Sequence, residues 1–349
     1  MSKFSTISKV EFKWEFVSLG EVLLRFDPGE TTIRNADEFK VYDGGAEYNV
    51  AKNLSYSFGR KTAIMTVIKN DQIGELLLRK ISEGGVATDF VTLVDSEESR
   101  NGMYFIERGK GLRAPDSVFD RKYTEISAIN VDSLDWVSIF EKGVRWFHTG
   151  GVLTGLSETT PNAAFEAMQT ASKHGAILSY DLNYRDSLWK NRGGKKAADK
   201  CNRRFLPLVD VLIGLPGYNP GYDDFDKTEF KTAAKELINL HPNIEIIAIT
   251  LRKVFSANIH SFCSAVYSNG EVYISKKYEK FEVLDRVGSG DAFTAGFFDA
   301  LLEGRNLKKA IENGSAAAVL ATTTFGDNLL SKSYEIEKLA EGGGSDVIR

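Results

Sequence analysis

The sequence predicts an α/β protein with one large, mostly parallel β-sheet, helices on both of its faces, and a small separate β-sheet. Short apolar runs rich in β-branched and aromatic residues alternate with longer segments whose apolar residues recur every three to four positions. Strands that alternate with helices favour a parallel sheet covered on both faces. Two regions interrupt this alternation, and they predict the separate sheet.

The expected strands of the large sheet are apolar runs bounded by Gly, Asp or Pro. They cover residues 15–24, 62–68, 177–181, 209–213 and 244–250. Helical spacing between or after several of them predicts helices over residues 162–174, 228–240 and 292–302. The whole chain, residues 1–349, is expected to form one domain.

The interrupting regions are residues 25–42 and 91–121. Within the second, residues 102–108 read GMYFIER, a two-residue periodicity typical of antiparallel strands that stand apart from a main sheet. We expect the two insertions to build a small β-lid. A pair of ordinary surface hairpins is the alternative, since many loops have no further role.

Composition and charge exclude several functional classes. The net charge of -4 predicts no general attraction to nucleic acid or anionic lipid. Cys201 and Cys263 are too few and too far apart for a disulfide framework or a thiolate metal site, so we expect buried thiols. Residues 1–16 build no signal-peptide core, and no apolar run reaches the length of a membrane span. The prediction is a cytoplasmic protein without nucleic-acid or membrane partners.

The most informative passage is residues 285–296, DRVGSGDAFTAG. A glycine-rich turn leads directly into a helix whose apolar stripe includes Phe293, Phe297 and Leu301. The N–H groups of residues 288–291 should therefore converge at a helix N-terminus, which is an anion-binding arrangement. Glycines also allow the backbone to approach a transferring phosphoryl group closely.

Asp291 stands inside this predicted anion site, where a carboxylate would repel phosphate but could serve as a base. It would accept the proton of a substrate hydroxyl that attacks the γ-phosphate of ATP, with Mg²⁺ offsetting charge. An aspartate of ordinary pKa suffices if the proton leaves late. The alternative is a plain turn with Asp291 as an N-cap. Phe293 rules out a dinucleotide fingerprint, and no P-loop sequence is present.

The passage as a whole resembles the second signature of the PfkB, or ribokinase-like, carbohydrate kinases. A counterpart of the first signature stands at residues 44–51, GGAEYNVA, and continues through Leu54 and Gly59. The resemblance covers the chain from about residue 17 to residue 327. It implies a three-layer α/β/α sandwich with a Rossmann-like sheet, a β-lid over a sugar, and ATP with Mg²⁺ as cosubstrates.

The resemblance also implies roles for individual residues. It assigns the anion hole to Gly288, Ser289 and Gly290, the base to Asp291, and the sugar-facing positions to Gly45 and Asn49. ATP would contact Thr250, Arg252, Gly288, Gly290, Asn313 and Asn328. The family's Asn-x-x-Glu motif for Mg²⁺ is replaced by Gly214-Leu215-Pro216-Gly217, so we name no metal ligand. The region often carries a monovalent-cation site in this family, and its retention stays open.

A second cluster of polar residues follows the apolar run that ends near residue 179. Asp181-Leu182-Asn183-Tyr184-Arg185 should lie at the carboxyl edge of a parallel strand, where ligands bind in open α/β sheets. Arg185 is a candidate for binding an anionic substrate group, and an ion pair with Asp181 or Asp186 is an equal alternative. On the lid, Arg121 is the second candidate arginine, whereas Arg108 is interpreted as a surface residue because Glu107 adjoins it.

Within the family, these passages look most like 2-keto-3-deoxygluconate kinases. The likeness rests on residues 104–109 through 120–121, on 181–189, on 250–252 and on 285–288, and residues 122–127 depart from it. It implies that Gly45, Tyr104, Arg121, Arg185 and Asp291 contact the substrate, whose carboxylate an arginine holds. A kinase for a neutral ketose such as fructose is the runner-up, and a non-catalytic sugar sensor is the third hypothesis. Pairing of two lids predicts a homodimer.

Overall fold

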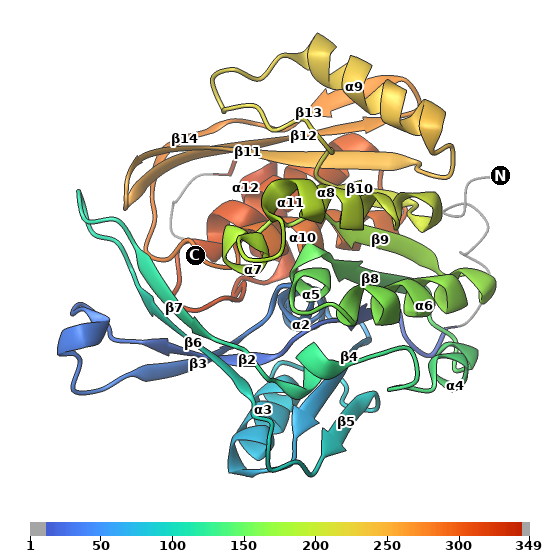
Figure 1. The fold of residues 1–349 in the computed structure, drawn as a ribbon. Helices are drawn as coiled ribbons and strands as arrows, with labels where there is room; N and C mark the ends of the chain where they lie inside the picture. The colour runs from blue at the N-terminus through green and yellow to red at the C-terminus, as the bar shows by residue number, and fades with distance from the viewer. Residues whose placement is uncertain (1–11, 344–349) are drawn as a thin grey trace.

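A computed structural model describes residues 12–343, which form a larger and a smaller β-sheet (Figure 1). Residues 1–11, on which the prediction of no signal segment mostly rests, lie outside this range. The strands of the larger sheet are β1 (Phe16–Leu19), β4 (Thr62–Lys69), β5 (Val91–Val94), β8 (Trp146–Gly150), β9 (Ile177–Asp181), β10 (Val211–Ile213), β11 (Ile246–Ser256), β12 (Ile259–Ser268), β13 (Glu271–Ile274) and β14 (Tyr278–Glu282).

These strands follow the order β13-β12-β11-β10-β9-β8-β1-β4-β5, with β14 paired to β12. Every neighbouring pair from β11 to β5 is parallel, and β12 pairs antiparallel with β11, β13 and β14. The carboxyl ends of the parallel strands therefore share one edge of the sheet. That edge positions most of the polar residues discussed below.

Helices cover both faces of the larger sheet (Figure 1). They are α2 (Ala46–Phe58), α3 (Gln72–Glu83), α4 (Trp136–Glu141), α5 (Gly151–Gly155), α6 (Thr160–Lys173), α7 (Asp186–Trp189), α8 (Gly194–Arg203), α9 (Lys227–Leu240), α10 (Ser289–Leu302), α11 (Leu307–Ala321) and α12 (Ser333–Ala340), with short 3-10 turns at Ile33–Asn35, Glu125–Ala128 and Leu206–Leu208.

Two hydrophobic cores separate the layers. On β1, Phe16 packs into the core that contains α2, α10 and α11, whereas Val17 and Leu19 pack into the core that contains α6 and α9. This alternation is what a strand buried on both faces produces. The predicted three-layer α/β/α class with a mostly parallel sheet is confirmed.

The smaller sheet, here called the lid, consists of β2 (Leu23–Asp27), β3 (Lys40–Gly44), β6 (Gly102–Glu107) and β7 (Asp116–Asp120), in the order β3-β2-β6-β7. The β2–β3 and β6–β7 pairs are antiparallel, as expected, but β2 and β6 run parallel. The predicted insertion 91–121 is too long, because residues 91–94 form β5 of the larger sheet.

The expected strand over residues 15–24 is wrong, because it divides into β1 and β2 in different sheets. The division falls at Gly20, where the side chain of Glu47 from α2 crosses the chain. A Cβ atom on Gly20 would lie 2.5 Å from the carboxylate of Glu47. The apolar run is continuous in the sequence, so only this crossing reveals the break.

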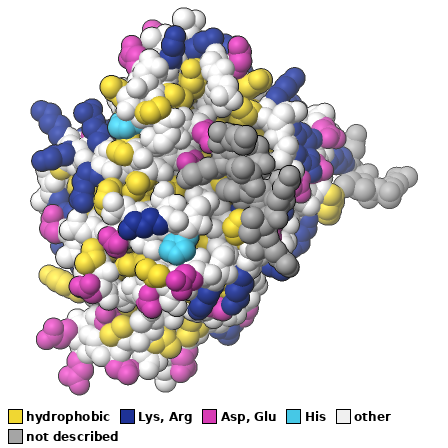
Figure 2. Space-filling model, turned by 90° about the vertical axis from the view of Figure 1, so that its right-hand side faces the viewer, with side chains coloured by type: hydrophobic (Ala, Val, Ile, Leu, Met, Phe, Trp, Pro, Cys, Tyr) yellow, Lys and Arg dark blue, Asp and Glu magenta, His cyan; other side chains and the backbone are white. Residues whose placement is uncertain are grey.

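The described surface agrees with the composition. Acidic and basic side chains are interspersed on the face shown in Figure 2, outside its grey atoms. Within residues 12–343, no helix combines the length and apolar character needed to cross a membrane. Both cysteines are free thiols, and the expectation of buried thiols is confirmed for Cys263 but not for Cys201, which is half-buried.

Candidate active site

The predicted anion turn is formed by the start of α10. Its N-cap is Gly288, whose φ of 74° lies in the left-handed region that glycine tolerates. A Cβ atom there would lie 1.8 Å from the carbonyl oxygen of Asp327, so the backbone itself requires glycine. Phe293 and Phe297 are fully buried and anchor the helix. The first N–H groups of α10 have no partners within the helix, which favours a bound anion.

Asp291 lies in the first turn of α10 and receives a hydrogen bond from Asn49. The distance from Asn49 Nδ2 to Asp291 Oδ2 is 2.7 Å. Burial raises the pKa of Asp291 well above its usual range, Asn49 and Arg185 oppose the rise, and Asp181 adds to it. The pKa of Asp291 therefore lies above the ordinary value that would already suffice for a base. A carboxylate with a raised pKa is better suited to accept a proton.

The first turn of α2 delivers Asn49 to this position. Gly45 is the N-cap of α2 with φ 145°, and a Cβ atom there would lie 2.0 Å from the carbonyl oxygen of Glu21. The N–H of Asn49 donates to the carbonyl of Gly45 over 2.7 Å, which starts the helix. The structure thus brings the two signature passages, 242 residues apart at Asn49 and Asp291, into direct contact.

Two buried glutamates near the strand ends were missed by the sequence analysis. Glu47 is 1% exposed, and its Oε1 accepts the N–H of Leu153 over 3.2 Å. Burial raises the pKa of Glu47 to about 7, backbone hydrogen bonds and Arg121 oppose the rise, and Asp181 adds to it. Glu21 is also 1% exposed and lies 2.6 Å from Arg121. The available signal was the presence of a glutamate within or next to an apolar stretch: Glu47 lies inside residues 44–51, and Glu21 follows the apolar residues of β1.

Arg185 lies after the carboxyl end of β9, as predicted, and its side chain is exposed. Within residues 12–343 it forms no ion pair, so the proposed pairing with Asp181 or Asp186 is not found. Asp181 instead accepts the N–H of Asn183 over 3.0 Å. Burial raises the pKa of Asp181 to about 6, and the Asn183 hydrogen bond and Arg185 oppose the rise. Arg185 therefore offers an unpaired guanidinium close to Asp181 and Asp291.

Tyr104 and Arg108, on the lid side of the site, make more contacts with neighbouring side chains than the sequence indicated. The hydroxyl of Tyr104 donates to Asp327, and its ring stacks on Phe119 with centroids 5.2 Å apart. Arg108 is not a surface residue: its side chain is 14% exposed, pairs with Asp27 at 3.1 Å, and lies 4.1 Å from the ring centre of Phe325.

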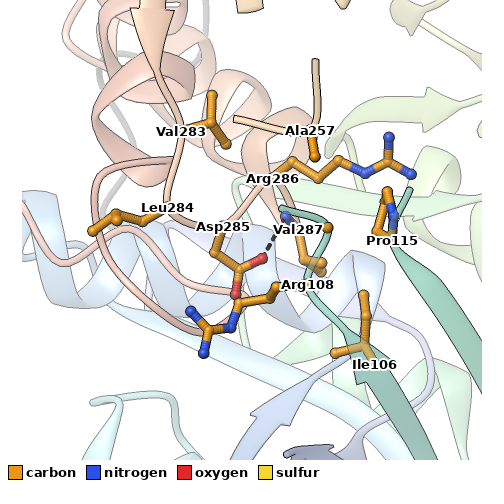
Figure 3. Close-up of a pocket in the computed structure, with 10 residues that line it drawn as sticks. Ile106, Arg108, Pro115, Ala257, Val283, Leu284, Asp285, Arg286 and Val287 are labelled. Carbon is orange, nitrogen blue, oxygen red and sulfur yellow. Dashed lines mark hydrogen bonds between the residues drawn. The ribbon is translucent and has the colours of Figure 1, made fainter. Parts of the chain in front are cut away.

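A small pocket lies between the lid and the loop that precedes α10. Figure 3 shows Ile106 of β6, with Arg108 and Pro115 of the connection between β6 and β7, facing Asp285, Arg286 and Val287 of that loop. The side chain of Arg286 points away from Asp285, whereas that of Arg108 lies beside it. The lid side of the pocket thus lies directly beside the loop that leads into the anion turn.

The residues assigned to ATP fall into two groups. Thr250 and Arg252 are exposed on β11, and partial burial together with Arg286 and Arg185 lowers the pKa of Arg252. The charges of Arg286 and Arg185 thus reach Arg252, so the three guanidinium groups belong to one positively charged region. Asn313 is 2% exposed within α11. Asn328 is buried and donates to the carbonyl of Asp43 in β3 over 3.3 Å, so it contacts the lid.

The described residues offer no cluster of side chains for Mg²⁺. Between residues 12 and 343, no group of three or more His, Cys, Asp or Glu side chains is arranged to hold a metal ion. Gly214, where the chain departs from Asn-x-x-Glu, has φ 92° and carries no donor side chain. The donor set does not fit a metal held mainly by protein carboxylates. Mg²⁺ can also bind through substrate phosphates and water.

Comparison with known proteins places these features in context. The family model for "pfkB family carbohydrate kinase" matches residues 15–214 and 263–333. A 2-dehydro-3-deoxygalactonokinase of Haloferax volcanii is 30% identical over 96% of this chain and 99% of its own length. A crystal structure of 2-dehydro-3-deoxygluconokinase from Thermotoga maritima has a TM-score of 0.87 and 32% identity, covering 94% of this chain and all of the other.

A more distant structure shares the fold alone. A putative ribokinase II from E. coli, in complex with ATP and Mg²⁺, has a TM-score of 0.76 at 18% identity and covers 94% of this chain and 99% of its own. The family match omits residues 215–262, which include Thr250 and Arg252. Gly288, Gly290, Asn313 and Asn328 lie within the matched residues.

Proposed function

Since this chain belongs to the pfkB family of carbohydrate kinases, we propose that it transfers the γ-phosphoryl group of ATP to the terminal hydroxyl of 2-keto-3-deoxygluconate or a closely related keto-sugar acid. The observation that carries the acid specificity is Arg185, an exposed guanidinium without an ion pair in residues 12–343. The two relatives named for keto-deoxy sugar acids support the same class.

In the proposed reaction, Asp291 accepts the proton of the acceptor hydroxyl as that oxygen attacks the γ-phosphorus and ADP leaves. Asn49 holds the carboxylate of Asp291 through its 2.7 Å hydrogen bond, which orients it toward the hydroxyl. The N–H groups of Gly288, Ser289 and Gly290 stabilise the charge on the transferring group. Because phosphoryl transfer has a loose transition state, positioning and electrostatics supply most of the acceleration.

The sugar would lie between the lid and the carboxyl ends of the central strands. We assign its carboxylate to Arg185, with Gly45, Asn49, Tyr104 and Arg121 lining the rest of the pocket. ATP, entering with Mg²⁺ on its phosphates, is assigned to Thr250, Arg252, Gly288, Gly290, Asn313 and Asn328.

The alternative of a neutral ketose such as fructose has one observation in its favour. Arg121, the second arginine proposed for the carboxylate, already pairs with Glu21 at 2.6 Å. Of the two candidate arginines, only Arg185 is then free to bind a substrate carboxylate unless Arg121 exchanges partners. A non-catalytic sensor is disfavoured by the intact contact between Asn49 and Asp291.

The deciding experiment offers the protein 2-keto-3-deoxygluconate, 2-keto-3-deoxygalactonate, fructose and ribose with MgATP and measures ADP formation. We expect turnover of a keto-deoxy acid and a fall in its kcat/KM of about 10- to 150-fold in Arg185→Leu, because one charge-assisted contact stabilises the complex by roughly 1.5 to 3 kcal/mol.

Arg203→Leu, which removes another exposed arginine at the end of α8, is the matched control and should leave kcat/KM unchanged. Preferred turnover of fructose, with no effect of Arg185→Leu, would transfer the proposal to the neutral ketose. Absence of turnover with every sugar would support the sensor.

We further propose that two lids pair to form a homodimer. Cross-strand neighbours Phe26, Phe105 and Val118 lie on one face of the lid, where the rings of Phe26 and Phe105 stack 5.0 Å apart and Val118 is 51% exposed. Apolar side chains on a protruding sheet favour a covering partner. Sedimentation should give a dimer that Val118→Asp dissociates, while Val137→Asp, at a 50% exposed valine on α4, should not. A monomeric wild type would contradict the proposal.

A further inference from the structure

Arg25 is a fully buried arginine in the lid strand β2, and three carboxylates surround it. Its Nη2 lies 2.9 Å from Asp27 and 2.5 Å from Asp285, and its Nη1 lies 2.9 Å from Asp327. A planar guanidinium can satisfy several carboxylates at once, which a lysine ammonium cannot do with the same geometry.

Two of these carboxylates belong to the loops that flank the anion turn. Asp285 accepts the N–H of Val287 over 3.1 Å, drawn in Figure 3, and the N–H of Gly326 over 3.2 Å. The carbonyl of Asp327 packs directly against Gly288, the N-cap of α10. Arg25 therefore holds together both loops on which the position of the turn depends.

The charges at this cluster do not balance without Arg25. Asp27 has a second cation in Arg108, at 3.1 Å, but within the described residues Arg25 is the only cation paired with Asp285 and Asp327. Burial raises the pKa of Asp327, Arg25 and the hydroxyl of Tyr104 oppose the rise, and Asp285 adds to it. Removing the guanidinium would leave two buried carboxylates to repel each other beside the anion turn.

We propose that Arg25 is a positioning residue that serves as the built-in cation of the anion turn, so that turnover needs no monovalent metal ion. The carboxylates of Asp285 and Asp327, which could otherwise hold such an ion, are already bonded to the guanidinium. A monovalent-cation site therefore does not fit these residues. The inference rests on the proposed use of the anion turn for phosphoryl transfer, but not on the identity of the acceptor.

The first test needs no variant. Wild-type turnover, with whichever acceptor sugar it uses, is measured in potassium, sodium and choline chloride at one ionic strength and saturating MgATP. We expect equal kcat values within twofold in all three salts. Activation by potassium of tenfold or more over choline would overturn the proposal, even if Arg25→Ala does not fold.

The second test removes the guanidinium. Arg25→Ala should lower kcat by about 100-fold, the order of loss that a displacement of about 1 Å in reacting groups produces. Guanidinium ion, added below denaturing concentrations, should restore part of that kcat, whereas choline should not. A kcat within twofold of wild type, or a loss that neither guanidinium nor potassium relieves, would contradict the positioning role.

Arg60 provides the matched control. It pairs with Asp299 at 2.6 Å, Glu303 at 3.1 Å and Glu15 at 3.2 Å, so it also holds three carboxylates, but at the far end of α10. Arg60→Ala should lower thermal stability while its kcat neither falls nor responds to guanidinium. Failure of the proposed role of Asp291 can be distinguished from failure of the proposed role of Arg25. If Asp291 is not the base, Asp291→Asn should retain activity, and its response to added cations should equal that of the wild type.

Discussion

Replacing Asp291 by asparagine is expected to lower kcat by about 10²- to 10⁴-fold, the range that a positioned general base contributes. The substitution keeps the size of the side chain and an oxygen that can accept the hydrogen bond from Asn49. Binding of ATP and sugar should therefore change much less than turnover. Steady-state kinetics with the preferred acceptor measures both effects.

The raised pKa of Asp291 also predicts how activity depends on pH. The proposed reaction needs the carboxylate form of Asp291, so kcat/KM should rise with pH through the folded-state pKa, at a pH above the usual range of an aspartate. An acid limb near 3.8, the ordinary pKa of an aspartate side chain, would contradict the effect of burial. The profile is recorded on the wild-type protein.

Stability should change in the opposite direction to activity. Above the unfolded pKa, the folded state holds the Asp291 proton more tightly than the unfolded state, so the free energy of unfolding falls as pH rises toward the folded pKa. Asparagine does not titrate, so Asp291→Asn avoids this loss of stability. The Tm of Asp291→Asn minus that of the wild type should therefore increase from pH 4 to pH 8. Asp299→Asn, in the same helix but paired with Arg60, should keep its kcat.

Replacing Gly288 by alanine is the second change for which we expect a large effect. The new Cβ would meet the carbonyl oxygen of Asp327 at 1.8 Å, and φ 74° disfavours a side chain as well. The turn must shift, and misplacing one anion-stabilising donor costs about 10²- to 10³-fold in kcat. A lower Tm should accompany the loss.

Gly304 separates the effect of the positive φ from the effect of the contact with Asp327. It has the same φ of 74°, but a Cβ atom there would meet nothing within 4 Å. Gly304→Ala should therefore show only the backbone cost of about 1–2 kcal/mol in stability, with kcat unchanged. If Gly288→Ala behaved in the same way as Gly304→Ala, the contact with Asp327 would not determine the turn.

Much of the anion turn could be predicted from the sequence because its determinants are local. A glycine-rich segment followed by helical apolar spacing predicts a helix N-terminus wherever the rest of the chain lies. The same holds for Arg185, which follows an apolar strand. The pairing of Asn49 with Asp291 was only implied by family resemblance, since nothing local connects positions so distant in the chain.

The sequence could not predict the environments of Arg25 and Arg108. A charged residue next to apolar residues in or beside a strand is typical of a solvent-facing position. Arg25 lies in β2, and Arg108 directly follows β6. Arg25 is buried against Asp285 and Asp327, which come from two distant segments, as well as Asp27 of its own strand. Arg108 pairs with Asp27 across the lid. The division of residues 15–24 between two sheets could not be predicted for the same reason, since it falls where the Glu47 side chain of α2, a distant segment, packs against Gly20.

By itself, the sequence determined the α/β class, the anion turn with its candidate base, and the family, because periodicity, glycine placement and helix termini act over a few residues. The tertiary structure alone decided which charges meet: Arg25 with three carboxylates, Arg121 with Glu21, and Arg185 with none in the described chain. Burial and pairing set the energy of a charge, and both depend on segments that only folding brings together.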